Sequence, residues 1–334
     1  MGKDKARIGI IGNGGIGSWH FSHLVEFDDV ELVAFCDIIP ERAENFKKNS
    51  GGTAQTFTCY KEMLNTVELD AVYVCVPPNC HGDIEMAIIE KGLPFLVEKP
   101  LALDMETAEK ICSAAAAKNL ITQVGFQDRY LDLTEKIQEY IAGKQIGLVS
   151  AAWVGGIPGV HWWRKMAESG GQIVEQNIHL YDMARYLFGD VDSVYCAAGK
   201  GIVDPDAPEY NVPGYDVDDY SSAVVKFKNG VIANIFTACY TLNGGGMRSG
   251  MNIYCKDATI EYALRSGVKY RDANGTEETA RQEDQGITED RTFIDSVKSG
   301  DGSANRSPYC DAIKSLKLCL AANESAVTGK EYKL

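Results

Sequence analysis

A glycine-rich turn near the N-terminus places the strongest constraint on how this chain can fold. The apolar run Arg7–Ile11 leads directly into Gly12-Asn13-Gly14-Gly15-Ile16-Gly17, and a helical pattern begins inside that turn. A second apolar run, Glu31–Phe35, is followed by Asp37, about 20 residues after the last glycine of the turn. A strand, a glycine turn, a helix and a second strand ending in an acid form the fingerprint of a dinucleotide-binding βαβ unit.

The glycines of this turn have separate tasks. Gly12 permits the tight turn, Gly14 lets the backbone approach a pyrophosphate, and Gly17 lets the helix touch the strand. Asp37 suits the ribose hydroxyls and repels a 2′-phosphate, and no arginine follows it directly, so NAD is favoured over NADP. A glycine turn of an unrelated α/β protein is the alternative. The residues expected to contact the cofactor are Gly12, Asn13, Gly14, Gly15, Ile16, Gly17 and Asp37.

The rest of the first 125 residues continues the alternation of strands and helices. Further strand candidates are Ala71–Val76, Pro94–Val97 and Ile121–Val124, and helical patterns separate them. Each strand is a nearly continuous apolar run, which is typical of strands buried on both faces of a parallel sheet. We therefore expect an α/β fold, with an NAD-binding Rossmann domain built on a doubly wound parallel sheet over residues 1–125.

The pattern changes after Gly125. Five strand candidates lie between residues 150 and 254, framed by helical patterns at Leu133–Ile141, Val174–Leu187 and Pro308–Val327. Lys228-Asn229-Gly230 predicts a hairpin with a type I′ turn, since Asn-Gly readily takes positive φ angles. The second domain, over residues 126–334, is expected to be α+β with an open, mostly antiparallel sheet.

Composition excludes several classes of protein. The formal net charge is −14, with no basic arm, so a nucleic-acid partner is not expected. No apolar run approaches the roughly 20 residues of a membrane span. The ten cysteines are scattered without a C-x-x-C, which argues against a disulfide framework and favours the cytoplasm. No cluster of histidines has the spacing of a zinc site, so no metal is expected, and no G-x-S-x-G nucleophile elbow occurs.

Polar residues follow two of the first domain's strands, where open α/β sheets bind their ligands. Glu98 and Lys99 end the run Pro94–Val97, and Pro100 restricts Lys99 to an extended backbone and permits a cis bond. A solvated surface lysine is the alternative for Lys99. The further residues expected on the cofactor side are Val76, Pro77, Asn79, His81, Glu98, Lys99 and Gln127.

The second domain supplies a possible acid–base pair. Glu175 and His179 are four residues apart, so on one helix they share a face, where the carboxylate can fix the tautomer of the imidazole. A satisfied polar pair on a helix face is the alternative. Trp162, Trp163 and Arg164 could form a platform for a sugar ring, or could be ordinary loop packing.

Taken together, these motifs resemble the Gfo/Idh/MocA oxidoreductase family, which includes glucose–fructose oxidoreductase and inositol 2-dehydrogenase. The resemblance rests on the glycine fingerprint, Glu98-Lys99-Pro100, Val124-Gly125-Phe126 and the segment Gly170–Asp182. It implies a substrate-binding second domain and oligomers, dimers or tetramers, that often pair through the outer face of its sheet. It also implies catalytic roles for Lys99 and His179. The family's aspartate position holds Glu175 here.

The leading interpretation is an NAD-dependent dehydrogenase that acts on the CH–OH group of a sugar, sugar derivative or cyclitol, or reduces the ketone. His179 would be the general base and Lys99 would stabilise charge on the substrate oxygen. Glu175 would orient His179 or bind a neighbouring hydroxyl. Lys99, Trp162, Trp163, Arg164, Glu175 and His179 are the expected substrate contacts. An NAD-recycling glycosidase or lyase that uses transient oxidation is the alternative, and a non-catalytic NAD-binding regulator is a third.

Overall fold

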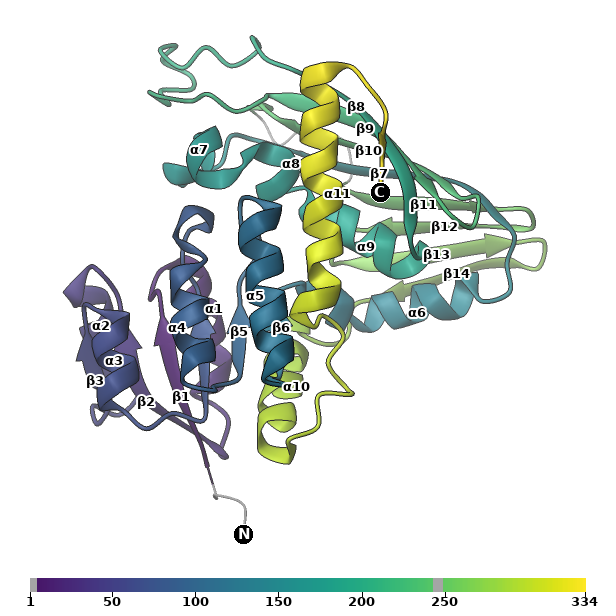
Figure 1. Cartoon of the computed structure of the whole chain (residues 1–334). Helices are drawn as coiled ribbons and strands as arrows, with labels where there is room; N and C mark the ends of the chain where they lie inside the picture. Colours follow the sequence, from purple (N-terminus) through teal and green to yellow (C-terminus); the bar gives the residue numbers. More distant parts are fainter. Residues whose placement is uncertain (1–4, 243–248) are drawn as a thin grey trace. The chain divides into compact units, whose positions relative to one another are not determined.

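The computed structural model describes residues 5–242 and 249–334 (Figure 1). It divides into two compact units, each made of two segments. The first unit contains Met1–Tyr130 and Asp284–Ile313, and the second contains Leu131–Glu283 and Lys314–Leu334. The sequence predicted two consecutive domains, 1–125 and 126–334, whereas the units interleave along the chain. Among the described residues, no helix combines the length and apolar character that a membrane span requires.

The first unit is built on a six-stranded parallel sheet in the order β3-β2-β1-β4-β5-β6, which is the order of a dinucleotide-binding fold. Its strands are β1 (Ala6–Ile11), β2 (Val30–Cys36), β3 (Gln55–Phe57), β4 (Ala71–Val74), β5 (Phe95–Val97) and β6 (Thr122–Val124). Its helices are α1 (Gly15–Leu24), α2 (Pro40–Asn49), α3 (Tyr60–Thr66), α4 (Asp83–Glu90), α5 (Met105–Ala117) and α10 (Gln285–Ser299), with 3₁₀ turns η1 (Pro78–Cys80) and η2 (Gln127–Tyr130). The predicted doubly wound parallel sheet is confirmed.

The core of this unit explains why its strands read as apolar runs. Ile8 and Ile10 of β1 and Phe35 of β2 are fully buried. Helix α10, yellow-green in Figure 1, packs against α1 and contributes Phe293 and Ile294 to the same core. A segment from late in the chain therefore completes the first unit.

One disulfide joins two segments of this unit that are distant in sequence. Cys112 of α5 bonds to Cys310, in the first turn of α11 (Tyr309–Thr328), across 198 residues. The other eight cysteines are free thiols. The scattered positions predicted no disulfide framework, and they gave no sign of this single bridge.

The second unit contains a nine-stranded sheet in the order β14-β13-β12-β11-β7-β10-β9-β8-β15, in which only β7 and β10 pair in parallel. Its strands are β7 (Ile146–Gly155), β8 (Val191–Gly199), β9 (Tyr220–Phe227), β10 (Ile232–Cys239), β11 (Gly250–Cys255), β12 (Ala258–Ala263), β13 (Gly267–Asp272), β14 (Gly275–Ala280) and β15 (Tyr332–Lys333). Its helices are α6 (Asp132–Ile141), η3 (Trp162–Arg164), α7 (Met166–Ser169), α8 (Gly171–Glu175), α9 (Ile178–Phe188) and most of α11. The predicted mostly antiparallel sheet is confirmed.

One face of this sheet is covered and the other is open. Buried and exposed residues alternate along β9, and α9 packs against β7 and β10 on the covered side. Exposed apolar side chains gather on the open face: Ile232 pairs with Leu148, which pairs with Tyr254. The open sheet therefore carries a continuous row of exposed apolar side chains.

The hairpin between β9 and β10 forms at the predicted residues but with a different turn. Gly230 has a φ of +93°, whereas Asn229 is not among the residues with positive φ. A type I′ turn needs positive φ at two successive residues, so that part of the prediction is wrong. The N–H of Phe227 donates to the carbonyl of Val231 at 2.9 Å, and the N–H of Gly230 donates to the carbonyl of Phe227 at 3.0 Å. These bonds close a three-residue loop in which Gly230 supplies the left-handed position.

Candidate functional site

The glycine turn of the first unit lies at the carboxyl ends of β1, β2 and β4. The N–H of Gly12 donates to the carbonyl of Cys36 at 2.8 Å, and the N–H of Cys75 donates to the carbonyl of Ile11 at 2.7 Å. Gly12 has a φ of +88°, and a Cβ there would lie 2.2 Å from the carbonyl oxygen of Cys75. A Cβ on Gly17 would lie 2.2 Å from the carbonyl oxygen of Gly12. Both positions therefore require glycine for the fold itself.

Gly14 and Gly15 differ from these two. The nearest atom to a Cβ on Gly14 is a guanidinium nitrogen of Arg42 at 3.9 Å, and a Cβ on Gly15 meets nothing within 4 Å. No described protein atom therefore requires glycine at either position. An outside group that approaches the backbone closely would require it, and the pyrophosphate of NAD at the start of α1 is such a group. The turn thus fits the cofactor as well as the fold.

Asp37 is held beside this turn at the end of β2. Its carboxylate accepts the N–H of Asn13 at 2.7 Å and the N–H of Ile39 at 2.9 Å. The side chain is 6% exposed. A guanidinium nitrogen of Arg42, which is half exposed, lies 3.9 Å from the carboxylate. The acid expected to bind the ribose is therefore fixed by backbone donors, and a cation that the sequence analysis did not single out lies next to it.

The segment after β4 brings a histidine toward the same sheet edge. Val76 lies close to Gly12, since its side chain would be 3.1 Å from a Cβ built there. Pro77 precedes η1, which contains the exposed Asn79. Nδ1 of His81 pairs with the buried carboxylate of Glu85 at 2.7 Å. Nε2 of His81 is buried and has no hydrogen-bond partner among the described residues.

Lys99 follows β5 and is joined to Pro100 by a cis peptide bond. Its N–H donates to the carboxylate of Glu98 at 3.1 Å, and that carboxylate is 3% exposed. Gly125 makes room for it, because a Cβ there would lie 2.2 Å from an oxygen of Glu98. Gln127, buried in η2, accepts a hydrogen bond from Gln285 of α10 at 2.7 Å. The glycine of the Val124-Gly125-Phe126 motif thus leaves space for the carboxylate of Glu98, the residue that precedes Lys99.

The second unit positions Glu175 and His179 differently from the expectation. The predicted single helix over Val174–Leu187 is two helices: α8 ends at Glu175, and α9 begins at Ile178. The amide N–H groups of Gln176 and Asn177 both turn back to the carbonyl of Gln172, which ends the first helix. The inference that Glu175 and His179 share the face of one helix is therefore wrong. Both side chains are nevertheless buried, at 2% and 5% exposure.

Trp153 of β7 is a neighbour of His179 that the sequence analysis missed. The two rings stack with centroids 5.9 Å apart, and the guanidinium of Arg265 lies 5.7 Å from the centre of the indole. Only the pairing of β7 with the central strands brings Trp153 to the covered face, so no local motif marks it. This stack gives His179 an aromatic wall on one side.

The two tryptophans of η3, for which the sequence analysis raised a sugar platform as a possibility, lie stacked on each other. The rings of Trp162 and Trp163 stack with centroids 6.0 Å apart and planes at 11°. Nε of Arg164 donates to the carbonyl of Pro158 at 2.7 Å, which holds the loop before the turn. All three residues are half-buried, and their contact with a substrate stays a prediction.

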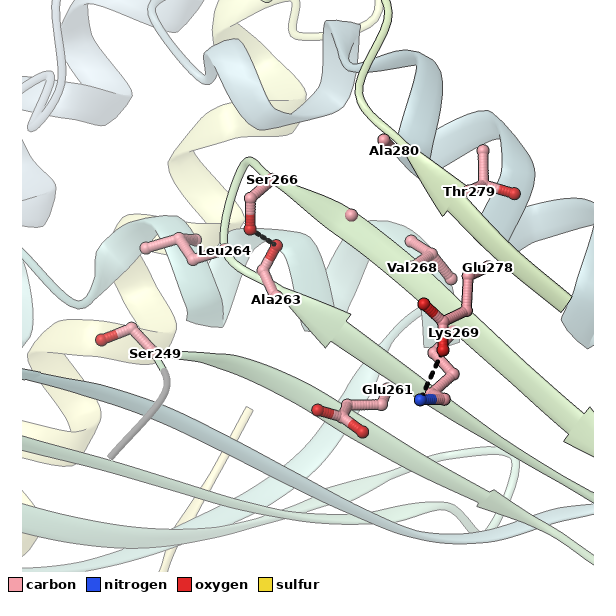
Figure 2. A pocket seen from close by; sticks show the side chains of 11 residues that line it. Ser249, Glu261, Ala263, Leu264, Ser266, Val268, Lys269, Glu278, Thr279 and Ala280 are labelled. Atoms are coloured by element: carbon pink, nitrogen blue, oxygen red, sulfur yellow. Dashed lines mark hydrogen bonds and ion pairs between the residues drawn. The ribbon is translucent and has the colours of Figure 1, made fainter. Parts of the chain in front are cut away.

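The second unit also contains a pocket of about 630 Å³ lined by β12, β13 and β14 at one edge of its sheet. Figure 2 shows Lys269 of β13 paired with Glu278 of β14 in its wall, at 2.5 Å. None of the predicted substrate contacts lines it.

Comparisons with known proteins agree with this geometry. Residues 6–126 match the family model described as an oxidoreductase family with an NAD-binding Rossmann fold, and residues 134–261 match the GFO/IDH/MocA C-terminal domain. The chain is 26% identical to myo-inositol 2-dehydrogenase of Thermotoga maritima, with 98% of each chain covered. It is 26% identical to D-glucoside 3-dehydrogenase of Escherichia coli, covering 100% of this chain and 99% of that one.

Solved structures show the same fold. The WlbA dehydrogenase of Bordetella pertussis, crystallised with NADH and UDP-GlcNAcA, superposes with a TM-score of 0.81 at 22% identity and covers 99% of both chains. An oxidoreductase of Agrobacterium radiobacter, crystallised with NAD+, L-tartaric acid and magnesium, gives a TM-score of 0.85 at 15% identity, with 98% of each chain covered.

Proposed function

Because this chain belongs to the Gfo/Idh/MocA oxidoreductase family and carries its NAD-binding Rossmann domain, we propose that it oxidises a secondary alcohol of a sugar, sugar derivative or cyclitol. The observation that carries the proposal is the full-length similarity to relatives named as dehydrogenases of an inositol and a glucoside. The buried His179 and the half-buried Lys99, each in a segment that the family model covers, support it.

Bound NAD supplies the hydride acceptor. His179 takes the proton of the substrate hydroxyl as general base. Lys99, as an ammonium group, donates a hydrogen bond to the same oxygen and stabilises the negative charge that develops there. Glu175 orients His179 or binds a neighbouring hydroxyl. In the reverse direction the same groups protonate the oxygen of a ketone.

The substrate platform consists of Trp162 and Trp163. Stacked indoles present apolar faces that suit the C–H side of a sugar or cyclitol ring, while Arg164 and Glu175 suit its hydroxyls. Trp153 adds a further ring beside His179. A polyol with one apolar face is the class of substrate that these residues favour.

We further propose a cytoplasmic homo-oligomer, a dimer or tetramer. Eight of the ten cysteines are free thiols, and this majority supports a reducing compartment, to which the Cys112–Cys310 bridge is the exception. The row Ile232, Leu148 and Tyr254 on the open sheet face supports association through that face, because exposed apolar patches of this kind mark interaction surfaces.

The experiment is a screen of inositols, glucosides and sugar acids with NAD, following the absorbance of NADH. The expected result is NADH formation over many turnovers with at least one ring alcohol. A product that forms for many turnovers with catalytic NAD, without NADH accumulation and with retention of a deuterium label from the oxidised carbon, would instead assign the chain to the NAD-recycling glycosidases or lyases. Absence of any NADH formation or product across the panel would contradict both.

A further inference from the structure

A buried group of ionisable side chains lies behind Lys99 in the first unit. His20 of α1 is fully buried and contacts a carboxylate at each ring nitrogen. Its Nε2 lies 3.0 Å from Glu98, and its Nδ1 lies 2.6 Å from Asp290 of α10. The second oxygen of Asp290 accepts from Nδ1 of His23 at 2.8 Å. The proposed function uses neither histidine and does not use Asp290, although Glu98 connects His20 to the N–H of Lys99.

The protonation of this group follows from its geometry. An imidazolium donates at both nitrogens, and His20 has an acceptor at each of them. Burial lowers the pKa of His20, but Asp290 and Glu98 outweigh this and hold it well above its usual value. Glu289, fully buried nearby, has its pKa raised well above the usual range by burial and by Glu98. With Glu289 neutral, the imidazolium of His20 lies between two charged carboxylates, those of Glu98 and Asp290.

We propose that His20 and Asp290 are positioning residues that fix the Glu98 carboxylate and, through it, the backbone of Lys99. One oxygen of Glu98 accepts from His20 and the other accepts the N–H of Lys99, so rotation of the carboxylate breaks one of the two bonds. Gly125 permits this orientation, since a Cβ there would lie 2.2 Å from an oxygen of the same carboxylate. This inference rests on the proposed function, because a fixed Lys99 matters only if Lys99 acts on the substrate.

A metal ion is the competing occupant of this group. Ligand atoms of His20, Glu98 and Glu289 lie within 4.8 Å of one another, and neither oxygen of Glu289 has a hydrogen-bond partner among the described residues. A metal would require a neutral His20 with a lone pair facing it. The observed short contacts at both nitrogens favour the imidazolium, which needs no further cation.

The test compares His20→Gln with His23→Gln, each in the wild-type and in the Lys99→Ala background. Both histidines bond to Asp290, but only His20 contacts Glu98. We expect His20→Gln to lower kcat by about 10-fold or more, as for a displaced catalytic group, while the Kd of NADH changes by less than about 2-fold. His23→Gln should leave kcat within about 2-fold, and in the Lys99→Ala background His20→Gln should add no further loss.

A readout without turnover accompanies these rates. After reductive ¹³C-methylation, the resonance of Lys99 is the one missing from Lys99→Ala. It should shift in His20→Gln and stay in place in His23→Gln. Should His20→Gln fail to fold, Asp290→Asn replaces it, with a smaller loss of kcat that again vanishes in Lys99→Ala.

Three outcomes overturn the inference: equal losses of kcat in the two histidine variants, a loss that persists undiminished in Lys99→Ala, or one equivalent of a transition metal in the purified protein by elemental analysis. An unchanged kcat in Lys99→Ala itself would overturn the catalytic role of Lys99 in the proposed function as well. A loss in Lys99→Ala together with an independent effect of His20→Gln would overturn this inference alone.

Discussion

In the first unit the candidate cofactor residues are held by backbone hydrogen bonds at strand ends, whereas in the second unit the candidate substrate residues lie on short helices and turns. Asp37 accepts two backbone N–H groups, and Gly12 and Gly17 are fixed by carbonyl oxygens within 2.2 Å of where a Cβ would be. His179, in contrast, follows a helix break. In the first unit, contacts with the backbone determine which residue type can occupy each position of the cofactor site. In the second unit, the backbone places fewer limits on which side chains can occupy the substrate site.

The largest effects are expected from one residue of each unit. Lys99→Ala and His179→Ala should each lower kcat by at least about 10²-fold, as expected for positioned acid–base groups. The Kd of NADH should stay near the wild-type value, because neither substitution alters the glycine turn. Steady-state kinetics on the alcohol from the screen and NADH fluorescence titration measure the two quantities.

Matched variants separate catalysis from general damage in this prediction. Lys110 of the first unit and His161 of the second are both exposed. Lys110→Ala and His161→Ala should keep wild-type kcat. Wild-type turnover in Lys99→Ala or His179→Ala would remove that residue from the proposed mechanism.

Within the first unit, alanine substitutions in the glycine turn should have two kinds of effect. Those at Gly12 and Gly17 should affect stability, whereas those at Gly14 and Gly15 should affect NAD binding. Gly12→Ala places a Cβ 2.2 Å from the carbonyl oxygen of Cys75 at a positive φ, so it should destabilise the fold by at least about 1–3 kcal/mol. Gly14→Ala meets no described protein atom closer than 3.9 Å, so it should keep the wild-type Tm and weaken NAD binding. Thermal unfolding measures the Tm of the two variants, and NADH titration measures their affinity for the cofactor. A Gly14→Ala protein with normal affinity would place the pyrophosphate elsewhere.

The same contrast explains how much the sequence could predict. The apolar runs, the glycine turn and Asp37 predicted the parallel sheet, because burial on both faces and steric limits act on neighbouring residues. Strand β14 escaped because its residues, Gly275–Ala280, are polar and largely exposed at a sheet edge. Strand β13 beside it also lacks an apolar run, since its sequence is GVKYRD. Helix α10 was missed as an element, and its return to the first unit depends on the contacts of Phe293 and Ile294 with strands nearly 300 residues earlier.

The candidate site was predictable to a similar extent. Lys99 follows a recognisable strand, so its place at the sheet edge could be expected. The break between Glu175 and His179 could not, since nothing in a four-residue spacing distinguishes one helix from two. Trp153 and Arg265 reach each other and His179 only through strand pairing, which local spacing does not encode.

Cofactor choice tests a smaller effect in the first unit. Asp37→Ser removes the charge that repels a 2′-phosphate and leaves the guanidinium of Arg42 in place, so kcat/KM with NADP should rise relative to NAD by up to about 10-fold. Asp37→Ser combined with Arg42→Ala is the matched control and should lose that gain. Side-by-side KM values for the two cofactors give the result. Equal use of NAD and NADP by the wild-type protein would contradict the role of Asp37.

The smallest effect is expected at Glu175, the last residue of α8. Glu175→Gln keeps the size of the side chain and one oxygen acceptor but removes the charge. If the carboxylate orients His179, kcat should fall by about 3–10-fold with little change in KM, because a partner that orients the base contributes less than the base itself. If the carboxylate binds a substrate hydroxyl, KM should rise instead.

Glu168→Gln removes a half-buried charge of the neighbouring helix α7, where Glu168 lies 3.6 Å from Lys165, and it should leave both constants unchanged. A loss of kcat in Glu175→Gln as large as that of His179→Ala would show that the carboxylate itself accepts the proton. In that case the break between α8 and α9 would be important for catalysis, because it lets Glu175 take a position that it could not have on one helix with His179.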